Sequence, residues 1–92
     1  MIKQKTYRSK KYLAWLREQP SVISGQPGEV HHIIGEGMGG MGTKASDLLA
    51  FSLTRIEHTA LHHDSRQWEA RHGPQWKHVA LTLERAAREG AL

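Results

Sequence analysis

The chain has 92 residues, with 13 Lys or Arg, 9 Asp or Glu, 7 His and no Cys, and its formal net charge is +4. This length allows one domain with a small core, so a bound metal or a partner would add useful stability. The absence of cysteine excludes disulfides and thiolate zinc sites, which leaves histidine as the abundant metal-binding side chain. No apolar stretch reaches the length of a signal peptide or a membrane span, which predicts a cytoplasmic protein without a membrane partner.

Positive charge is concentrated at the N-terminal end. Residues 1–20 hold six basic residues and one acidic residue, whereas residues 21–92 hold seven basic and eight acidic residues. We therefore expect a basic arm and helix (1–20) and a nearly neutral body (21–92) within one compact domain. Such a patch suits DNA, because each neutralised phosphate releases counterions, although a solvated face that only aids solubility explains the charge equally well. The candidate phosphate contacts in the arm are Lys3, Lys5, Arg8, Lys10 and Lys11.

The expected elements follow from apolar spacing and from the breaks made by glycine and proline. In chain order they are a helix over 7–19, a strand over 29–34, a glycine-rich loop over 35–42, a strand over 48–53, and helices over 55–63, 65–71 and 75–89. This order predicts an α+β domain in which one β-hairpin packs on helices. Three tryptophans fall on apolar stripes and are expected in the core: Trp15, Trp68 and Trp76.

The histidines form a pattern typical of a metal site. His58 and His62 are four residues apart in an expected helix, so both imidazoles project from one face. His31 and His32 are adjacent in an expected strand and point to opposite faces, so one can bind a metal while the other faces a substrate. Three imidazoles on a divalent ion leave positions open for water or phosphate, and a further histidine beside them suits a general base. The alternative is a closed structural zinc site that has His63 or Asp47 as a fourth ligand.

These residues resemble a known family. His31-His32, Asp47 and the HxxxH motif are similar to the HNH endonucleases, in which a hairpin and a helix form a ββα-metal core around one catalytic ion. The segment HHIIGEGMGGMGTKASDLLAFSL, followed by EHTALHH, resembles a phage and prophage subgroup associated with recombination, and this resemblance covers residues 21–92. It implies a metal-dependent DNA endonuclease with one Mg, Mn or Zn ion. The implied partners are DNA and a RecA-type recombinase filament.

The resemblance also implies roles for single residues. His31, His58 and His62 become the metal ligands, and His32 becomes the general base. Asp47 stands where the family often has Asn, and there it would orient the base or stand near the metal, where a carboxylate would favour a hard cation such as Mg. Three basic residues near these positions are further candidate phosphate contacts: Lys44, Arg55 and Arg66.

One departure from the subgroup concerns a second, structural zinc site. Its cysteine and histidine positions correspond here to Ser21, Ser24, Thr54 and Glu57, so a second zinc is not expected, and the base of the hairpin would be held by packing of the tryptophans. The main alternative to a nuclease is a catalytically silent DNA-binding or recombination accessory module with a structural metal. A third reading is an interaction protein in which the histidine cluster is incidental.

Overall fold

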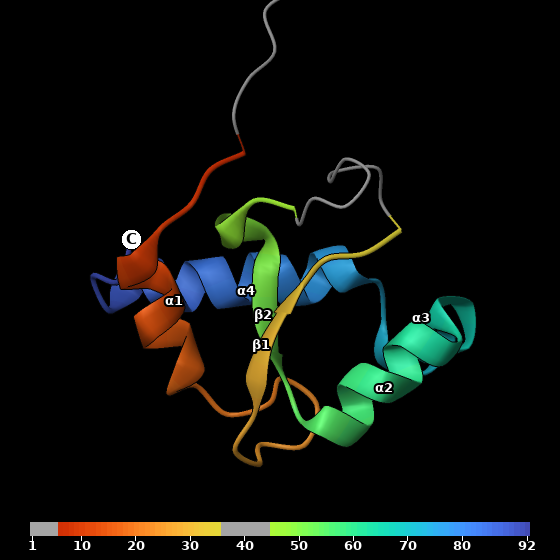
Figure 1. Ribbon diagram of the computed structural model, residues 1–92. Helices are drawn as coiled ribbons and strands as arrows, with labels where there is room; N and C mark the ends of the chain where they lie inside the picture. Colours follow the sequence, from red (N-terminus) through yellow and green to blue (C-terminus); the bar gives the residue numbers. More distant parts are fainter. Residues whose placement is uncertain (1–5, 36–44) are drawn as a thin grey trace, which may run out of the picture.

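One antiparallel β-hairpin forms the centre of the molecule, and four α-helices surround it (Figure 1). This is seen in a computed structural model that describes residues 6–35 and 45–92. The elements in chain order are α1 (Lys10–Arg17), β1 (Glu29–His32), a 3-10 turn η1 (Asp47–Leu49), β2 (Ala50–Leu53), α2 (Arg55–His63), α3 (Ser65–His72) and α4 (Gln75–Arg88). The prediction of a small α+β domain built on one hairpin is confirmed. The glycine-rich loop expected at 35–42 lies, apart from Gly35, outside the described residues.

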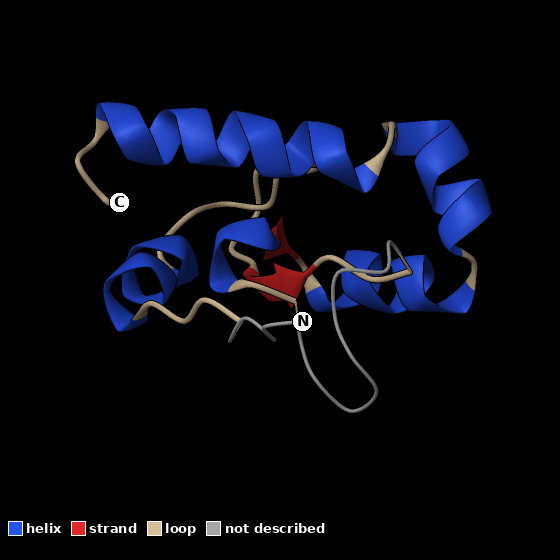
Figure 2. Cartoon of the chain, turned by 90° about the horizontal axis from the view of Figure 1, so that it is seen from above, coloured by secondary structure: helices blue, strands red, loops and turns tan. Residues whose placement is uncertain are grey.

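The hairpin pairs His31 with Phe51 and His32 with Ala50, and all four residues of β2 are buried. Figure 2 shows α4 running along one side of the molecule, with the hairpin, α1 and α2 beside it. Two core clusters form around β2. The first joins the hairpin to the last three helices through Phe51, Leu53, Leu61, Trp68 and Val79, and the second joins it to α1 through Tyr12, Leu16, Ala50 and Ala86. The residues paired with His31 and His32 across the hairpin, Phe51 and Ala50, therefore each lie in one of the two core clusters.

The first helix begins three residues later than its apolar pattern predicts. Ser9 caps α1 by accepting a hydrogen bond from the N–H of Tyr12, and residues 7–9 lie outside the helix. The reason is a contact distant in sequence, because the Asp47 N–H donates to the Tyr7 carbonyl at 3.0 Å and the Ser9 N–H donates to Asp47 Oδ2 at 2.8 Å. The described part of the basic segment is thus bound to the body.

The last helix, α4, does not bury the tryptophan that was expected in the core. Gln75 is buried, and its side chain pairs with the backbone of Ile34: the Ile34 N–H donates to Oε1 at 3.0 Å, and Nε2 donates to the Ile34 carbonyl at 2.9 Å. This contact ends β1 before Ile34 and turns Gln75, Val79 and Ala86 inward, so that Trp76 is 40% exposed. The expectation that Trp76 belongs to the core is wrong. None of the helices in the described residues is long and apolar enough to cross a membrane.

Candidate metal centre and histidine–aspartate pair

Three imidazoles meet where α2 packs beside β1. His31, His58 and His62 each place one possible ligand atom within 4.8 Å of the others, and residues 6–35 and 45–92 contain one such group. His31 is 1% exposed, His58 is half-buried and His62 is exposed. The cluster is therefore anchored in the core at one end and open to solvent at the other.

Local sequence explains why α2 presents its histidines here. Thr54 directly follows β2 and caps the helix, with a reciprocal pair of hydrogen bonds between Thr54 and Glu57 that forms a capping box. The helix therefore starts at the end of the hairpin, and residues four apart lie on one of its faces. The imidazole rings of His58 and His62 have centroids 4.7 Å apart, and that of His31 is 4.6 Å from His58.

A carboxylate orients the second imidazole. His58 Nδ1 lies 3.0 Å from Glu29 Oε1, and this hydrogen bond, followed by those of Arg55, lowers the pKa of Glu29 although burial opposes it. The ionised carboxylate accepts the Nδ1–H, which leaves a lone pair on Nε2, the usual arrangement for a metal-binding histidine. That Nε2 atom faces His62 Nε2 at 2.9 Å. A cation held by both nitrogens would take the place of this hydrogen bond.

The buried imidazole of His31 is also in the neutral form that binds a metal. Burial, followed by the neighbouring His58 and His62, lowers the pKa of His31 to about 4, while the contact to Gln75 opposes this shift. His31 is therefore neutral at neutral pH, as a ligand must be. Its Nε2 lies 3.4 Å from Gln75 Oε1. The donor set is all imidazole, which suits Zn and the later transition metals better than Mg.

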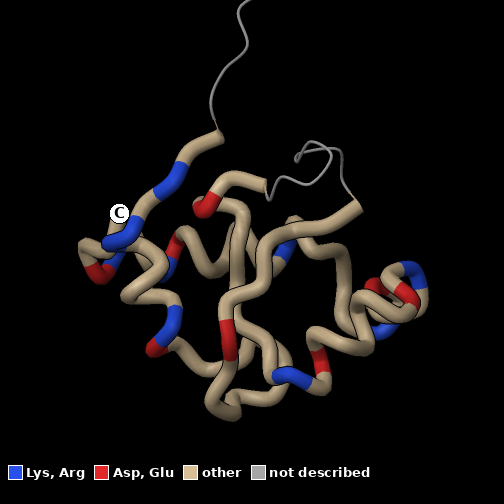
Figure 3. The backbone as a smooth tube through the Cα atoms, in the orientation of Figure 1, with Lys and Arg blue, Asp and Glu red and all other residues tan. Residues whose placement is uncertain are grey.

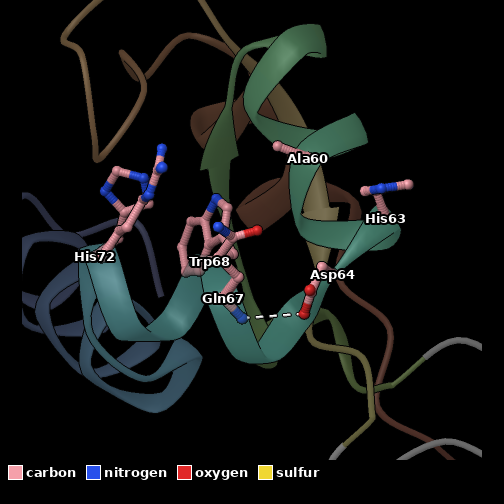
Figure 4. Close-up of a pocket in the computed structure, with 7 residues that line it drawn as sticks. Ala60, His63, Asp64, Gln67, Trp68 and His72 are labelled. Atoms are coloured by element: carbon pink, nitrogen blue, oxygen red, sulfur yellow. Dashed lines mark hydrogen bonds between the residues drawn. The ribbon is translucent and has the colours of Figure 1, made fainter.

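A fourth ligand of the closed structural type is not among the described residues. His63 is exposed, and Figure 4 shows it at the end of α2, directed away from Trp68. It borders a groove of about 150 Å³ between α2 and α3, together with Ala60, and this groove lies on a different face of α2 from His58 and His62. Asp47, the other candidate for the fourth ligand, is bonded to His32 instead.

On the opposite face of β1, His32 forms a pair with Asp47. The His32 Nε2 and Asp47 Oδ1 atoms are 2.8 Å apart, and Asp47 is 2% exposed. Burial raises the pKa of Asp47, but hydrogen bonds from His32, the Ser9 N–H and Arg8 together lower it below its usual range. The carboxylate is thus ionised and accepts the Nε2–H of His32. The Nδ1 atom of His32 then keeps its lone pair and is free to accept a proton.

The predicted phosphate contacts fall into three groups. Lys3, Lys5 and Lys44 lie outside the described residues. Arg8 binds Asp47, Lys11 donates to the Leu92 carbonyl at 3.3 Å, and Arg55 pairs with Glu29 beside the histidine cluster. Lys10 and Arg66 are exposed. Figure 3 shows Lys and Arg spread over several elements, so the charge is not gathered beside the hairpin alone.

The four positions that correspond to a structural zinc site also meet, but as a polar cluster. Ser21 donates to Glu57 Oε1, which also accepts the Thr54 N–H at 2.8 Å. Burial raises the pKa of Glu57, but hydrogen bonds from Ser21, Thr54 and Ser24 lower it by more, so the net shift is downward. These bonds tie the segment before β1 to the start of α2. This Ser21–Glu57 cluster acts beside the expected tryptophan packing, in which Trp68 lies in one core cluster with Phe51 and Leu53.

Sequence reasoning missed two residues of the site, Glu29 and Gln75. Glu29 lies two positions before His31 and so on the same face of the strand, a signal that could have been used. Gln75 could not have been found in this way, because its contact with His31 depends on how α4 packs.

Comparisons with known proteins place the chain in a family. Residues 1–90 match the DUF968 family, described as a protein of unknown function. The uncharacterized protein YdfU of Escherichia coli strain K12 is 38% identical over 91 residues, which are 98% of this chain and 26% of that protein, so the chain spans about a quarter of this relative. No solved structure shows a significant match. The chain belongs to the DUF968 family.

Proposed function

We propose that this chain is a metal-dependent DNA endonuclease that hydrolyses phosphodiester bonds, with a ββα-metal core of the HNH type made by β1, β2 and α2. The observation that carries this proposal is the division of labour between two consecutive residues. His31 joins a three-histidine cluster on one face of β1, and His32 joins a buried aspartate on the other. A metal site directly next to an oriented base supplies the two contributions that speed phosphodiester hydrolysis, stabilisation of charge on the phosphate and removal of a proton from water.

His32 acts as the general base. Its Nε2–H is held by Asp47 Oδ1, so Nδ1 takes the proton from the attacking water. Asp47 stays ionised because the Ser9 N–H and Arg8 donate to it, and its charge stabilises the imidazolium that forms. The role of Asp47 is therefore to orient the base rather than to bind the ion.

His31, His58 and His62 would hold the divalent ion. When bound, the ion supplies Lewis-acid stabilisation of negative charge on the phosphate. Glu29 fixes the ring of His58, and the exposed side chain of His62 leaves the cluster open toward solvent. Arg55, whose side chain is 81% exposed, lies beside this opening and is suited to contact a DNA phosphate. A RecA-type filament is proposed as the setting in which the DNA is met, in the cytoplasm.

The test is cleavage of supercoiled plasmid by this chain with Mg, Mn and Zn in turn and with a chelator. We expect nicking that depends on the ion and is lost in His32→Ala, while His63→Ala, which removes an exposed histidine outside the cluster, cuts like wild type. Failure of the wild type to cut with every ion, alone and on a RecA filament, would contradict the proposal. Metal binding without cleavage would instead favour the catalytically silent accessory module.

A further inference from the structure

The segment before α1 is bound to the histidine–aspartate pair through three contacts. Arg8 Nη1 lies 3.2 Å from Asp47 Oδ1 and donates to the Ala45 carbonyl at 2.5 Å. The Ser9 N–H donates to Asp47 Oδ2 at 2.8 Å, and the Asp47 N–H donates to the Tyr7 carbonyl at 3.0 Å. Both carboxylate oxygens and the backbone of Asp47 are thus held by residues almost 40 positions earlier.

We propose that Arg8 is a positioning residue for the His32–Asp47 pair, and that it sets the rate of bond cleavage rather than the affinity for DNA. This inference rests on the proposed nuclease function. It replaces the expectation from sequence that Arg8 is one more phosphate contact in a basic arm. It also makes the segment 7–9 a working part of the site, although it lies more than 20 residues before the first histidine.

The charge balance of the buried carboxylate supports this role. Asp47 is 2% exposed, and an ionised carboxylate at such a position is costly unless cations and N–H groups surround it. Arg8 supplies a permanent positive charge to this carboxylate, with Nη1 3.2 Å from Oδ1. The Arg8 side chain is 45% exposed, yet Nη1 is directed inward to Asp47 and Ala45.

Geometry gives a second reason. Asp47 Oδ1 accepts from both His32 and Arg8, so the guanidinium fixes the oxygen that holds the His32 Nε2–H. Without that contact Oδ1 is held by His32 alone, while the Ser9 N–H holds only Oδ2, so the oxygen that accepts the His32 Nε2–H is less firmly placed. Arg8 reaches Asp47 and Ala45 with one nitrogen, Nη1, which the planar guanidinium holds in a fixed direction, whereas a lysine keeps the charge on a flexible stem without that fixed direction.

The kinetic test compares Arg8→Met, Arg8→Lys and the matched control Arg17→Met in the full chain. Arg17 is an exposed arginine at the other end of α1, so its loss removes the same charge without touching Asp47. We expect Arg8→Met to lower kcat about 10-fold or more, with KM and its salt dependence matching those of Arg17→Met, and Arg8→Lys to restore part of kcat. A rise in KM with kcat within about twofold of wild type would overturn the inference.

A second readout does not need activity. The nitrogen-15 spectrum of the His32 ring in the metal-free protein at pH 8 reports which nitrogen carries the proton. We expect the Nε2–H form in wild type and Arg17→Met, and a loss of that preference in Arg8→Met. An unchanged spectrum in Arg8→Met would overturn the inference. If wild type does not cut DNA at all, the proposed function fails, whereas the spectrum still decides the role of Arg8.

Discussion

The two faces of β1 are built in different ways. The His31 face joins β1 to α2, the element that follows the hairpin, and it leaves the Nε2 atoms of His58 and His62 facing each other at 2.9 Å. The His32 face is completed by protein groups alone, because Asp47, Arg8 and the Ser9 N–H satisfy one another. Under the proposed function an ion completes the first face, whereas the N-terminal segment completes the second. Removing the ion and removing the segment should have separable effects.

The largest expected effect is on the His31 face. His58→Ala removes one of three ligands, so we expect the affinity for Zn or Mn to fall by about 1,000-fold or more, since loss of a ligand costs more than the 10–100-fold seen for groups behind the ligands. DNA cleavage should be lost as well. Isothermal titration with each ion measures the affinity, and His63→Ala provides the control. A His58→Ala protein that binds the ion like wild type would show that the cluster is not the metal site.

A substitution on the His32 face should lower the rate of DNA cleavage without changing the affinity for the metal. Asp47→Asn keeps the shape of the side chain but removes the charge that holds the His32 Nε2–H, so we expect kcat to fall about 100-fold, within the range typical of general-base catalysis. Metal affinity should stay within about twofold of wild type, because Asp47 does not belong to the three-histidine group. Plasmid cleavage and metal titration on the same preparation measure both. Loss of the ion in Asp47→Asn would place the carboxylate at the metal instead.

Acid should destabilise the His31 face of the metal-free protein first. The pKa of His31 is lowered to about 4, mainly by burial, so between about pH 6.5 and pH 4 the unfolded chain binds more protons than the folded one. The stability that His31 provides is full above pH 6.5 and falls as the pH drops through this window, by about 3 kcal/mol in total. Burial also lowers the pKa of His78, which adds a loss in the same direction.

The carboxylates behave differently in this window. The pKa values of Asp47 and Glu57 lie below their usual range because of their hydrogen bonds, so their contributions persist until the pH falls below about 4. Urea unfolding with a chelator at pH 7.5, 6 and 4.5 measures the effect, and His31→Asn should flatten the curve. A free energy of unfolding that does not change between pH 7.5 and 4.5 would contradict a neutral, buried His31.

The smallest expected effect sharpens the role of Glu29. Glu29→Gln keeps a side-chain oxygen near His58 Nδ1 but removes the negative charge, so we expect metal affinity to fall about 10-fold. Because Glu29 also pairs with Arg55, the matched control is Arg55→Gln, which breaks that ion pair but leaves the contact to His58. Equal losses in the two variants would assign the effect to the ion pair rather than to the orientation of His58.

Local patterns explain what could be predicted. The helix predicted over 55–63 is confirmed, and the HxxxH spacing places His58 and His62 on one of its faces. The adjacent pair His31-His32 was expected to divide between two faces of a strand, and the structure places it so. The contact between the His31 face of β1 and α2 thus follows from short patterns along the chain.

Contacts distant in sequence explain what was missed. Residues 7–9 lie outside the helix because they bind Asp47, and this contact overrides the helical pattern that starts at Tyr7. The pairing of Gln75 with Ile34 sets which face of α4 is buried, and this orientation places Trp76 outside the core. In both cases a polar side chain satisfies backbone groups far away in sequence, and hydrophobic spacing carries no signal of such a bond.

The separation of the two faces is tested most directly by the metal content of His32→Ala, measured by mass spectrometry beside wild type after loading with Zn or Mn. We predict one ion per chain in both proteins, together with loss of plasmid cleavage in the variant. Loss of the ion in His32→Ala would show that His32 is a ligand, and would contradict the assignment of metal binding and proton transfer to opposite faces of β1.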